Sequence, residues 1–271
     1  MSRPLCAVGF AMLLGLAPLS ALAAGSVFLE ELTTAELQVR IQRGTHVVLV
    51  PIGGTEQNGP HMALGKHNAR VRALAGLIAQ EVSDTVVAPV LAYVPEGAIS
   101  PPTAHMRFAG TISIPEPAFE SLLESAARSL CSHGLREVFF LGDHGGYRAS
   151  LARVAHRLQR VGGAGAPCHG VALDSYYASS QDGFARWLRS QGYGAHEIGT
   201  HAGLSDTAIS LAVDPANVRV ELLEAAGREG GAAGVYGDPA RASSALGQQG
   251  VRMVVAASVD AIRKHLEKAK P

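Results

Sequence analysis

The feature that most constrains the fold of this chain is a short apolar run that passes directly into a glycine-rich polar stretch. His46-Val-Val-Leu-Val50 has the length and β-branched content of a buried strand. After it, Glu56, His61 and His67 follow one another within twelve residues, separated by glycines and a proline. Carboxylate and imidazole are the usual ligands of a catalytic zinc, so this stretch predicts a metal site at a strand end. The alternative is a polar surface loop that happens to carry two histidines.

The rest of the chain alternates strand-like and helix-like segments. Strand-like runs recur at 85–94, 137–141 and 170–173, and helical spacing is found at 33–43, 69–82, 116–133, 150–160, 179–191, 203–212 and 251–268. Residues 95–115 form a long irregular segment, and loops of that length in a compact domain are usually functional. The alternation predicts βαβ units with a mainly parallel sheet, and the apolar strands indicate helices on both faces. We expect one α/β domain.

The N-terminus has the pattern of a cleaved export signal. Arg3 precedes a nearly apolar stretch from Leu5 to Leu22, and Ala21-Leu-Ala23 fits a cleavage site. We expect a signal peptide over 1–23, a mature domain over 24–271, and a periplasmic or secreted protein. A membrane anchor is the alternative, but Pro18 breaks its short apolar core. No later segment reaches the eighteen apolar residues of a membrane span, so no membrane association is expected after cleavage.

Charge and cysteine content limit the partners. The 23 basic and 23 acidic residues balance to a net charge of zero, and no basic run stands out. Nucleic acid and anionic membranes are therefore poor partners, and a small-molecule substrate is expected. Cys6 leaves with the signal peptide, whereas Cys131 and Cys168 remain in an oxidising compartment. The sequence does not decide whether Cys131 and Cys168 form a disulfide or are two separate buried thiols.

Two further polar clusters lie where a parallel sheet collects ligand sites, beyond the carboxyl ends of strands. Gly142-Asp-His-Gly-Gly146 directly follows a strand, which favours His144 as a ligand over a loop-capping histidine. In Gly199-Thr-His-Ala-Gly203, His201 lies near a helix N-terminus and could serve as a general acid or base, or only as a cap residue. Asp206 could carry a proton or be a first-turn acid favoured by the helix dipole.

Several phrases, in the same order, resemble the creatininase (creatinine amidohydrolase) family. They are Pro51-Ile-Gly-Gly-Thr-Glu-Gln-Asn-Gly-Pro-His61, Phe108-Ala-Gly-Thr-Ile-Ser113, Gly142-Asp-His-Gly-Gly146, His201-Ala-Gly203 and Gly237-Asp-Pro239. The resemblance implies a three-layer creatininase-like fold and a homo-oligomer, often a hexamer. It also implies a metal-dependent hydrolase of non-peptide C–N bonds, such as those of small cyclic amides.

The family's site residues carry over only in part. By this resemblance Glu56 and His144 are metal ligands and His201 is catalytic. A histidine ligand of the family falls on Asn58, and the aspartate that bridges two metals falls on His67. Gly146 stands where creatininase has a further carboxylate ligand, and Asp206 replaces a family glutamate.

These departures favour one metal ion per chain over two. Imidazole binds one metal through one nitrogen, whereas a carboxylate bridges two cations readily. We therefore expect Glu56, His67 and His144 to hold a single ion with an open position for water, zinc rather than manganese. A second, weaker ion is the alternative, with Asp143, His61, Asn58 or Asp206 among its ligands. His105, in the long loop, is assigned a substrate contact.

The expected function is an exported amidohydrolase that cleaves a small amide or lactam with a metal-activated water. His201 or Asp206 would carry the proton to the departing nitrogen. Two alternatives remain: a hydrolase of peptide termini, which needs an extended groove with anchors for a terminal charge, and a catalytically altered protein that binds a metabolite or a partner. Metal content would separate the hydrolases from the binding protein.

Overall fold

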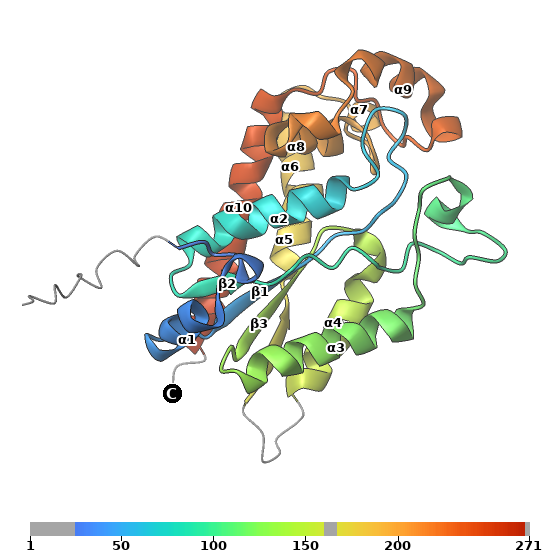
Figure 1. Cartoon of the computed structure of the whole chain (residues 1–271). Helices are drawn as coiled ribbons and strands as arrows, with labels where there is room; N and C mark the ends of the chain where they lie inside the picture. Colours follow the sequence, from blue (N-terminus) through green and yellow to red (C-terminus); the bar gives the residue numbers. More distant parts are fainter. Residues whose placement is uncertain (1–24, 160–166, 269–271) are drawn as a thin grey trace, which may run out of the picture.

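The computed structural model describes residues 25–159 and 167–268, with a parallel sheet at the centre (Figure 1). The expected signal peptide lies outside the described residues. The four strands run in the order β2-β1-β3-β4, and each neighbouring pair is parallel. Their bounds are β1 (Val47–Ile52), β2 (Thr85–Val87), β3 (Glu137–Gly142) and β4 (His169–Ala172).

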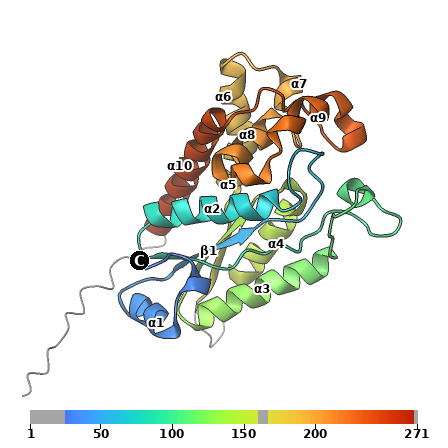
Figure 2. The ribbon, with the colours of Figure 1, turned by 45° about the horizontal axis from the view of Figure 1, so that its top comes forward.

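Helices cover both faces of this sheet. In both views α2 and α10 lie on one side and α3 and α4 on the other (Figure 1, Figure 2). The helices are α1 (Thr34–Gln42), α2 (Lys66–Glu81), α3 (Glu116–Ser132), α4 (Arg148–Gln159), α5 (Asp174–Ala178), α6 (Phe184–Ser190), α7 (Ala195–Ile198), α8 (Leu204–Val213), α9 (Leu223–Glu229) and α10 (Ser244–Lys268). The three-layer α/β prediction is confirmed.

Strand β1 shows why an uninterrupted apolar run was needed. All six of its residues are buried, and successive side chains enter opposite cores. Val48 and Val50 pack in the cluster that contains residues of α3 and α4, whereas Val47 and Leu49 pack in the cluster of α2 and α10. A polar residue at any of these positions would be buried in an apolar layer.

Two helices begin three or more residues earlier than the sequence predicted: α10 begins at Ser244 rather than near residue 251, and α2 begins three residues early. The apolar spacing indicated a helix from residue 69, but α2 begins at Lys66, so His67 lies in its first turn rather than in a loop. Hydrophobic periodicity missed this turn because Lys66, His67 and Arg70 are polar and yet buried. The helix expected at 179–191 begins with a π-helical segment, Ser179–Gly183, and becomes α-helical only in α6, from Phe184.

Two features fix the outer layers. Gly247 of α10 lies so close to α8 that a Cβ atom there would overlap the Ala208 carbonyl group. Cys131, at the end of α3, forms a disulfide with Cys168, next to β4, across a Cα–Cα distance of 5.5 Å. Of the two cysteine alternatives the structure thus has the disulfide. Within the described ranges, every helix is too short or too polar to span a bilayer.

Candidate metal centre

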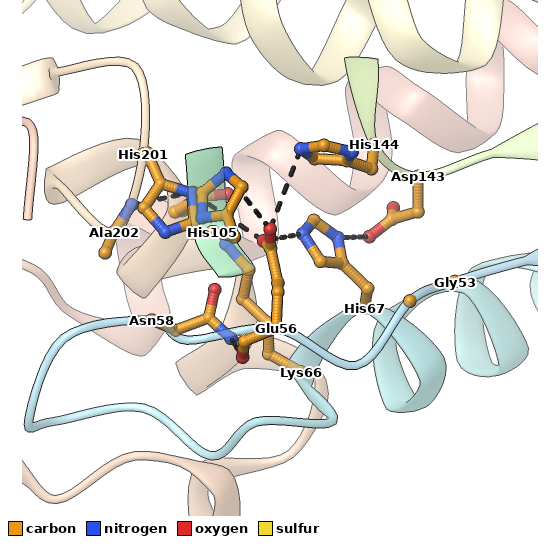
Figure 3. A network of polar contacts seen from close by, with 12 residues as sticks. Gly53, Glu56, Asn58, Lys66, His67, His105, Asp143, His144, His201 and Ala202 are labelled. Atoms are coloured by element: carbon orange, nitrogen blue, oxygen red, sulfur yellow. Dashed lines mark hydrogen bonds and ion pairs between the residues drawn. The ribbon is translucent and has the colours of Figure 1, made fainter. Parts of the chain in front are cut away.

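The expected site residues come together beyond the carboxyl ends of the strands, as the parallel sheet predicts. Glu56 lies in the loop after β1, and His144 directly follows β3 (Figure 3). His201 precedes α8, and the long loop between β2 and α3 contributes Glu96 and His105.

Glu56 is the centre of this group. Its side chain is fully buried, and Oε1 lies 2.7 Å from His67 Nε2. Oε2 lies 3.2 Å from His105 Nε2 and 3.7 Å from His144 Nε2. Burial by itself would raise the pKa of Glu56, but the hydrogen bond and charge of His67, with further help from His144, hold that pKa well below its usual value. Glu56 is therefore an ionised carboxylate.

Glu96 is a site residue that the sequence analysis missed. It is buried, and its Oε2 lies 3.5 Å from His144 Nδ1. Burial, followed by the charge of Glu56, raises the pKa of Glu96 to about 9. Neither oxygen of Glu96, nor Oε2 of Glu56, has a hydrogen-bond partner among the described residues. His105 Nε2 is close to Glu56 Oε2 but is not aligned as a hydrogen bond.

These orphaned oxygens are what a cation would satisfy. Burying polar oxygens without partners is costly, and ionising both neighbouring carboxyl groups would add mutual repulsion. Oxygen or nitrogen atoms of Glu56, Glu96, His105 and His144 all lie within 4.8 Å of one another. Carboxylate oxygen and imidazole nitrogen suit zinc and manganese, so the residues present fit a divalent metal.

The structure places His67 differently from the expected ligand set. Its Nε2 faces Glu56, and its Nδ1 lies 2.6 Å from Asp143 Oδ2. Arg70 Nη2 also lies 3.1 Å from Nδ1, so both ring nitrogens of His67 are already engaged by neighbouring side chains. A metal bound at His67 would have to displace one of these two contacts.

Asp143 is fully engaged in a buried network. Its Oδ2 accepts a hydrogen bond from Arg70 Nε at 2.8 Å, and its Oδ1 accepts one from the Tyr176 hydroxyl at 2.7 Å. Burial opposes its ionisation, but the charge of Arg70 lowers the pKa of Asp143. A carboxylate with these partners supports His67 rather than offering a free oxygen to a metal.

Asp206 belongs to the same network. It accepts hydrogen bonds from Lys66 Nζ at 2.8 Å, from Arg70 Nη1 at 2.8 Å, and from the backbone N–H of Ala202 at 2.9 Å. Against the opposing effect of burial, Lys66 and Arg70 hold the pKa of Asp206 well below its usual value. Asp206 thus anchors the segment after His201, where Ala202 has a left-handed φ of 54°.

His61 and Asn58 make hydrogen-bond contacts that hold the loop after β1 in place. His61 is buried, its Nε2 lies 3.0 Å from Thr207 Oγ1, and burial lowers its pKa to about 4. Asn58 donates to the backbone carbonyls of Glu56 and Ala63 at 2.9 and 3.1 Å. Neither residue contributes to the four converging ligand atoms.

His201 is buried beside Glu56, with its Nδ1 3.7 Å from Oε1. Its Nε2 lies 3.0 Å from the backbone carbonyl oxygen of Gln57. Burial, and then the charge of Lys66, lower the pKa of His201 to about 3. His201 is therefore a neutral imidazole in this site.

Two cavities share histidines in their walls. One, of about 280 Å³, is lined by His105, His144 and His201 together with Tyr177 and Tyr236. The other, of about 440 Å³, shares His105 and His144 and extends along 95–98 and 114–116. Larger hollows lie between α2 and α10 and around the amino ends of the strands, away from these groups. The open space at the site therefore extends to both sides of its histidines.

The fold and the site define a class, that of three-layer α/β proteins with a buried carboxylate–histidine cluster that fits a divalent metal. Comparison with known proteins gives the family. Residues 30–262 match the family model described as creatininase, creatinine amidohydrolase. The chain belongs to the creatininase family, and it is a metal-dependent amidohydrolase.

Individual relatives differ in what they act on. A mycofactocin precursor peptide peptidase of Mycolicibacterium smegmatis is 30% identical, over 80% of this chain and 85% of that protein. The protein of that name in Mycobacterium tuberculosis is 32% identical, over 79% and 81%. A creatinine amidohydrolase of Pseudomonas putida is 27% identical, over 70% and 73%.

Solved structures confirm the fold. A manganese form of creatininase superposes with a TM-score of 0.69 at 23% identity, over 89% of this chain and 98% of that one. A mutant creatininase of the Zn-Zn type superposes with a TM-score of 0.70 at 22% identity, over 89% and 99%.

Proposed function

We propose that this protein cleaves an amide bond in an elongated, peptide-like substrate. The observation that carries this proposal is the pair of cavities that lie against the same two residues, His105 and His144. A substrate that reacts beside these two residues can extend in both directions. The peptidase relatives share more identity with this chain than the creatinine amidohydrolase does, and this also supports a peptide-like substrate. This reverses the order of the two substrate classes that the sequence favoured.

A single divalent ion fits the residues present. Glu56, Glu96 and His144 would hold it, which leaves a position for water and substrate. Zinc is the first candidate and manganese the second, since creatininases are known in both forms. Glu96 supplies a carboxylate from a different segment than Gly146, where the family has one. The position of His67 between two carboxylates supports one ion rather than two.

The chain's own groups supply the remaining chemistry. When bound, a divalent metal activates a water molecule and polarises the scissile carbonyl. His201 Nδ1 accepts the proton that this water loses and returns it to the departing nitrogen. Asp206 and Lys66 hold the backbone of this segment in place, so we assign Asp206 a positioning role rather than proton transfer.

A small cyclic amide is the second candidate. The cavity of about 280 Å³, here called the inner cavity, is lined by His105, His144 and His201. A compact substrate would therefore not need the cavity of about 440 Å³, here called the outer cavity. The creatinine amidohydrolase relative supports this reading.

A paired substrate screen separates the two. Purified protein, stripped of metal and then reloaded with zinc or manganese, is incubated with short peptides of varied length and with lactams and small amides. Mass spectrometry identifies the products. We expect metal-dependent cleavage of peptides; turnover of lactams alone would support the second candidate, and no turnover of either class would contradict the proposal.

We also propose export and homo-oligomerisation. The Cys131–Cys168 disulfide supports an oxidising compartment. Exposed apolar side chains at Leu64, Ile99 and Ile112 support contact with further copies of the chain. Cell fractionation and light scattering after gel filtration test these two statements.

A further inference from the structure

We propose that Gln57 is a positioning residue that fixes the tautomers of His105 and His201, and so gives these neighbouring imidazoles opposite roles. Their rings are close, with centroids 4.5 Å apart. The Gln57 side-chain nitrogen lies 3.1 Å from both rings, and its backbone carbonyl oxygen also contacts His201. The catalytic meaning of this device rests on the proposed function, but the tautomers themselves can be observed without any substrate.

The orientation of the Gln57 amide is determined by its surroundings. Its Oε1 accepts a hydrogen bond from the Gly59 N–H at 3.0 Å, and its Nε2 donates to the Gly234 carbonyl at 3.2 Å. Rotating the amide by half a turn would set donor against donor at Gly59 and acceptor against acceptor at Gly234. The NH₂ group therefore faces His105.

The space for this side chain comes from Gly234. Residue 234 has a left-handed φ of 76°, and a Cβ atom there would overlap the Gln57 amide. Gln57 is 5% exposed, so it cannot move outward into solvent without opening the site. The absence of a side chain at Gly234 therefore leaves the space that the buried Gln57 amide occupies.

The first consequence is the state of His105. Its Nδ1 lies 3.1 Å from Gln57 Nε2, which only donates, so Nδ1 must accept. The ring hydrogen is then on Nε2, which lies beside Glu56 Oε2 at 3.2 Å. His105 therefore presents an N–H to the site and offers no lone pair to a metal.

The second consequence is the state of His201. Its Nε2 lies 3.0 Å from the Gln57 carbonyl oxygen, which only accepts. The two amide hydrogens of Gln57 are directed to His105 and Gly234, so we assign the ring hydrogen of His201 to Nε2. Gln57 Nε2 also lies 3.1 Å from His201 Nε2, but two donors do not form a hydrogen bond. His201 Nδ1 is left with the lone pair that faces Glu56. One imidazole can donate to a carbonyl oxygen of the substrate while the other accepts a proton.

The test is ¹⁵N NMR of the full chain with labelled histidines, in metal-free and zinc-loaded protein. Protonated and unprotonated ring nitrogens resonate far apart, and the substitutions His105→Asn and His201→Asn assign the signals. We expect both residues as neutral Nε2–H tautomers, with or without zinc. An Nδ1–H tautomer at His105, or zinc on its Nε2, would overturn the proposal.

Substitutions at position 57 add a second test. Gln57→Glu places an acceptor beside His105 Nδ1, so the hydrogen should move to Nδ1; Gln57→Met removes the donor, and the preference for Nε2–H should weaken. Gln181→Glu is the matched control, because it adds the same charge to the wall of the same cavity and should leave the His105 tautomer unchanged. An equal response to Gln181→Glu, or no response at position 57, counts against the assignment. Because none of these spectra requires turnover, a failed substrate screen would not affect them.

Discussion

At the scale of single residues, Glu96 distinguishes this site from what the sequence motifs describe. Its two oxygens lie buried beside Glu56 without partners among the described residues, and burial with the neighbouring charge raises its pKa to about 9. Such a carboxyl group gains from a bound cation, which favours its ionised form.

We therefore expect Glu96→Gln to weaken metal binding by at least about 10- to 100-fold, because an amide oxygen is a poorer ligand than a carboxylate. The dissociation constant for zinc, measured by competition with a chromophoric chelator, checks this. Glu116→Gln is the control: Glu116 lines the same outer cavity but is exposed and pairs with Arg153. Equal affinities of Glu96→Gln and the unaltered protein would remove Glu96 from the ligand set.

Which site residues could be predicted depended on where they lie along the chain. Glu56 and His144 lie within four residues of the ends of buried strands, so the rule for parallel sheets and the motifs both pointed to them. Glu96 lies in a long irregular loop without periodicity, and only the tertiary path of that loop brings it to Glu56. The sequence indicated that the loop was functional, but not which of its side chains enters the site.

At the scale of elements, the contact between α2 and α8 depends on buried ion pairs. Lys66 and Arg70 of α2 both bind Asp206 of α8, and all three side chains are almost fully buried. Removing one partner of such a network leaves the remaining charges buried and uncompensated, which costs about 3–5 kcal/mol.

We expect Asp206→Asn to lower the free energy of unfolding by about 3–5 kcal/mol at neutral pH. Since the pKa of Asp206 is lowered in the folded state, its contribution is present above the unfolded value and is lost as pH falls through the folded value. The difference from the unaltered protein should therefore shrink below about pH 4.

Urea unfolding of both proteins across this pH range makes the measurement. Asp260→Asn, which breaks an exposed pair with Lys264 on α10, is the control and should change little. A difference that stays constant as pH falls would show that packing, and not charge, connects α2 to α8.

The sequence misplaced the start of α2 because polar residues are buried there. The first turn of α2 is buried through polar side chains, so an apolar periodicity could not reveal it. The strands and α3 are buried through apolar side chains, and their bounds came within a residue or two of the predictions, except for the second strand, which ends at Val87.

At the scale of the whole molecule, the disulfide fastens α3 to the β4 side of the sheet. Cys131 and Cys168 are 37 residues apart in sequence, and closing a loop of that length restricts the unfolded chain by roughly 4 kcal/mol. The sequence left this pairing open because spacing alone does not give the distance between two cysteines.

We expect the double substitution Cys131→Ala, Cys168→Ala to lower the free energy of unfolding by roughly 2–4 kcal/mol without loss of the metal site, which lies elsewhere. Reducing agent should have the same effect on the unaltered protein and none on the double variant. A variant as stable as the oxidised protein would show that the bridge does not stabilise the fold.

The most direct test of the proposed metal centre is the metal content of the purified chain. It is measured by inductively coupled plasma mass spectrometry, without chelating tags or added metal. A centre built from Glu56, Glu96 and His144, with His67 held between carboxylates, predicts about one zinc or manganese ion per chain. About two ions per chain would contradict the single-ion centre. No metal, and none taken up on titration, would contradict a working metal-dependent hydrolase.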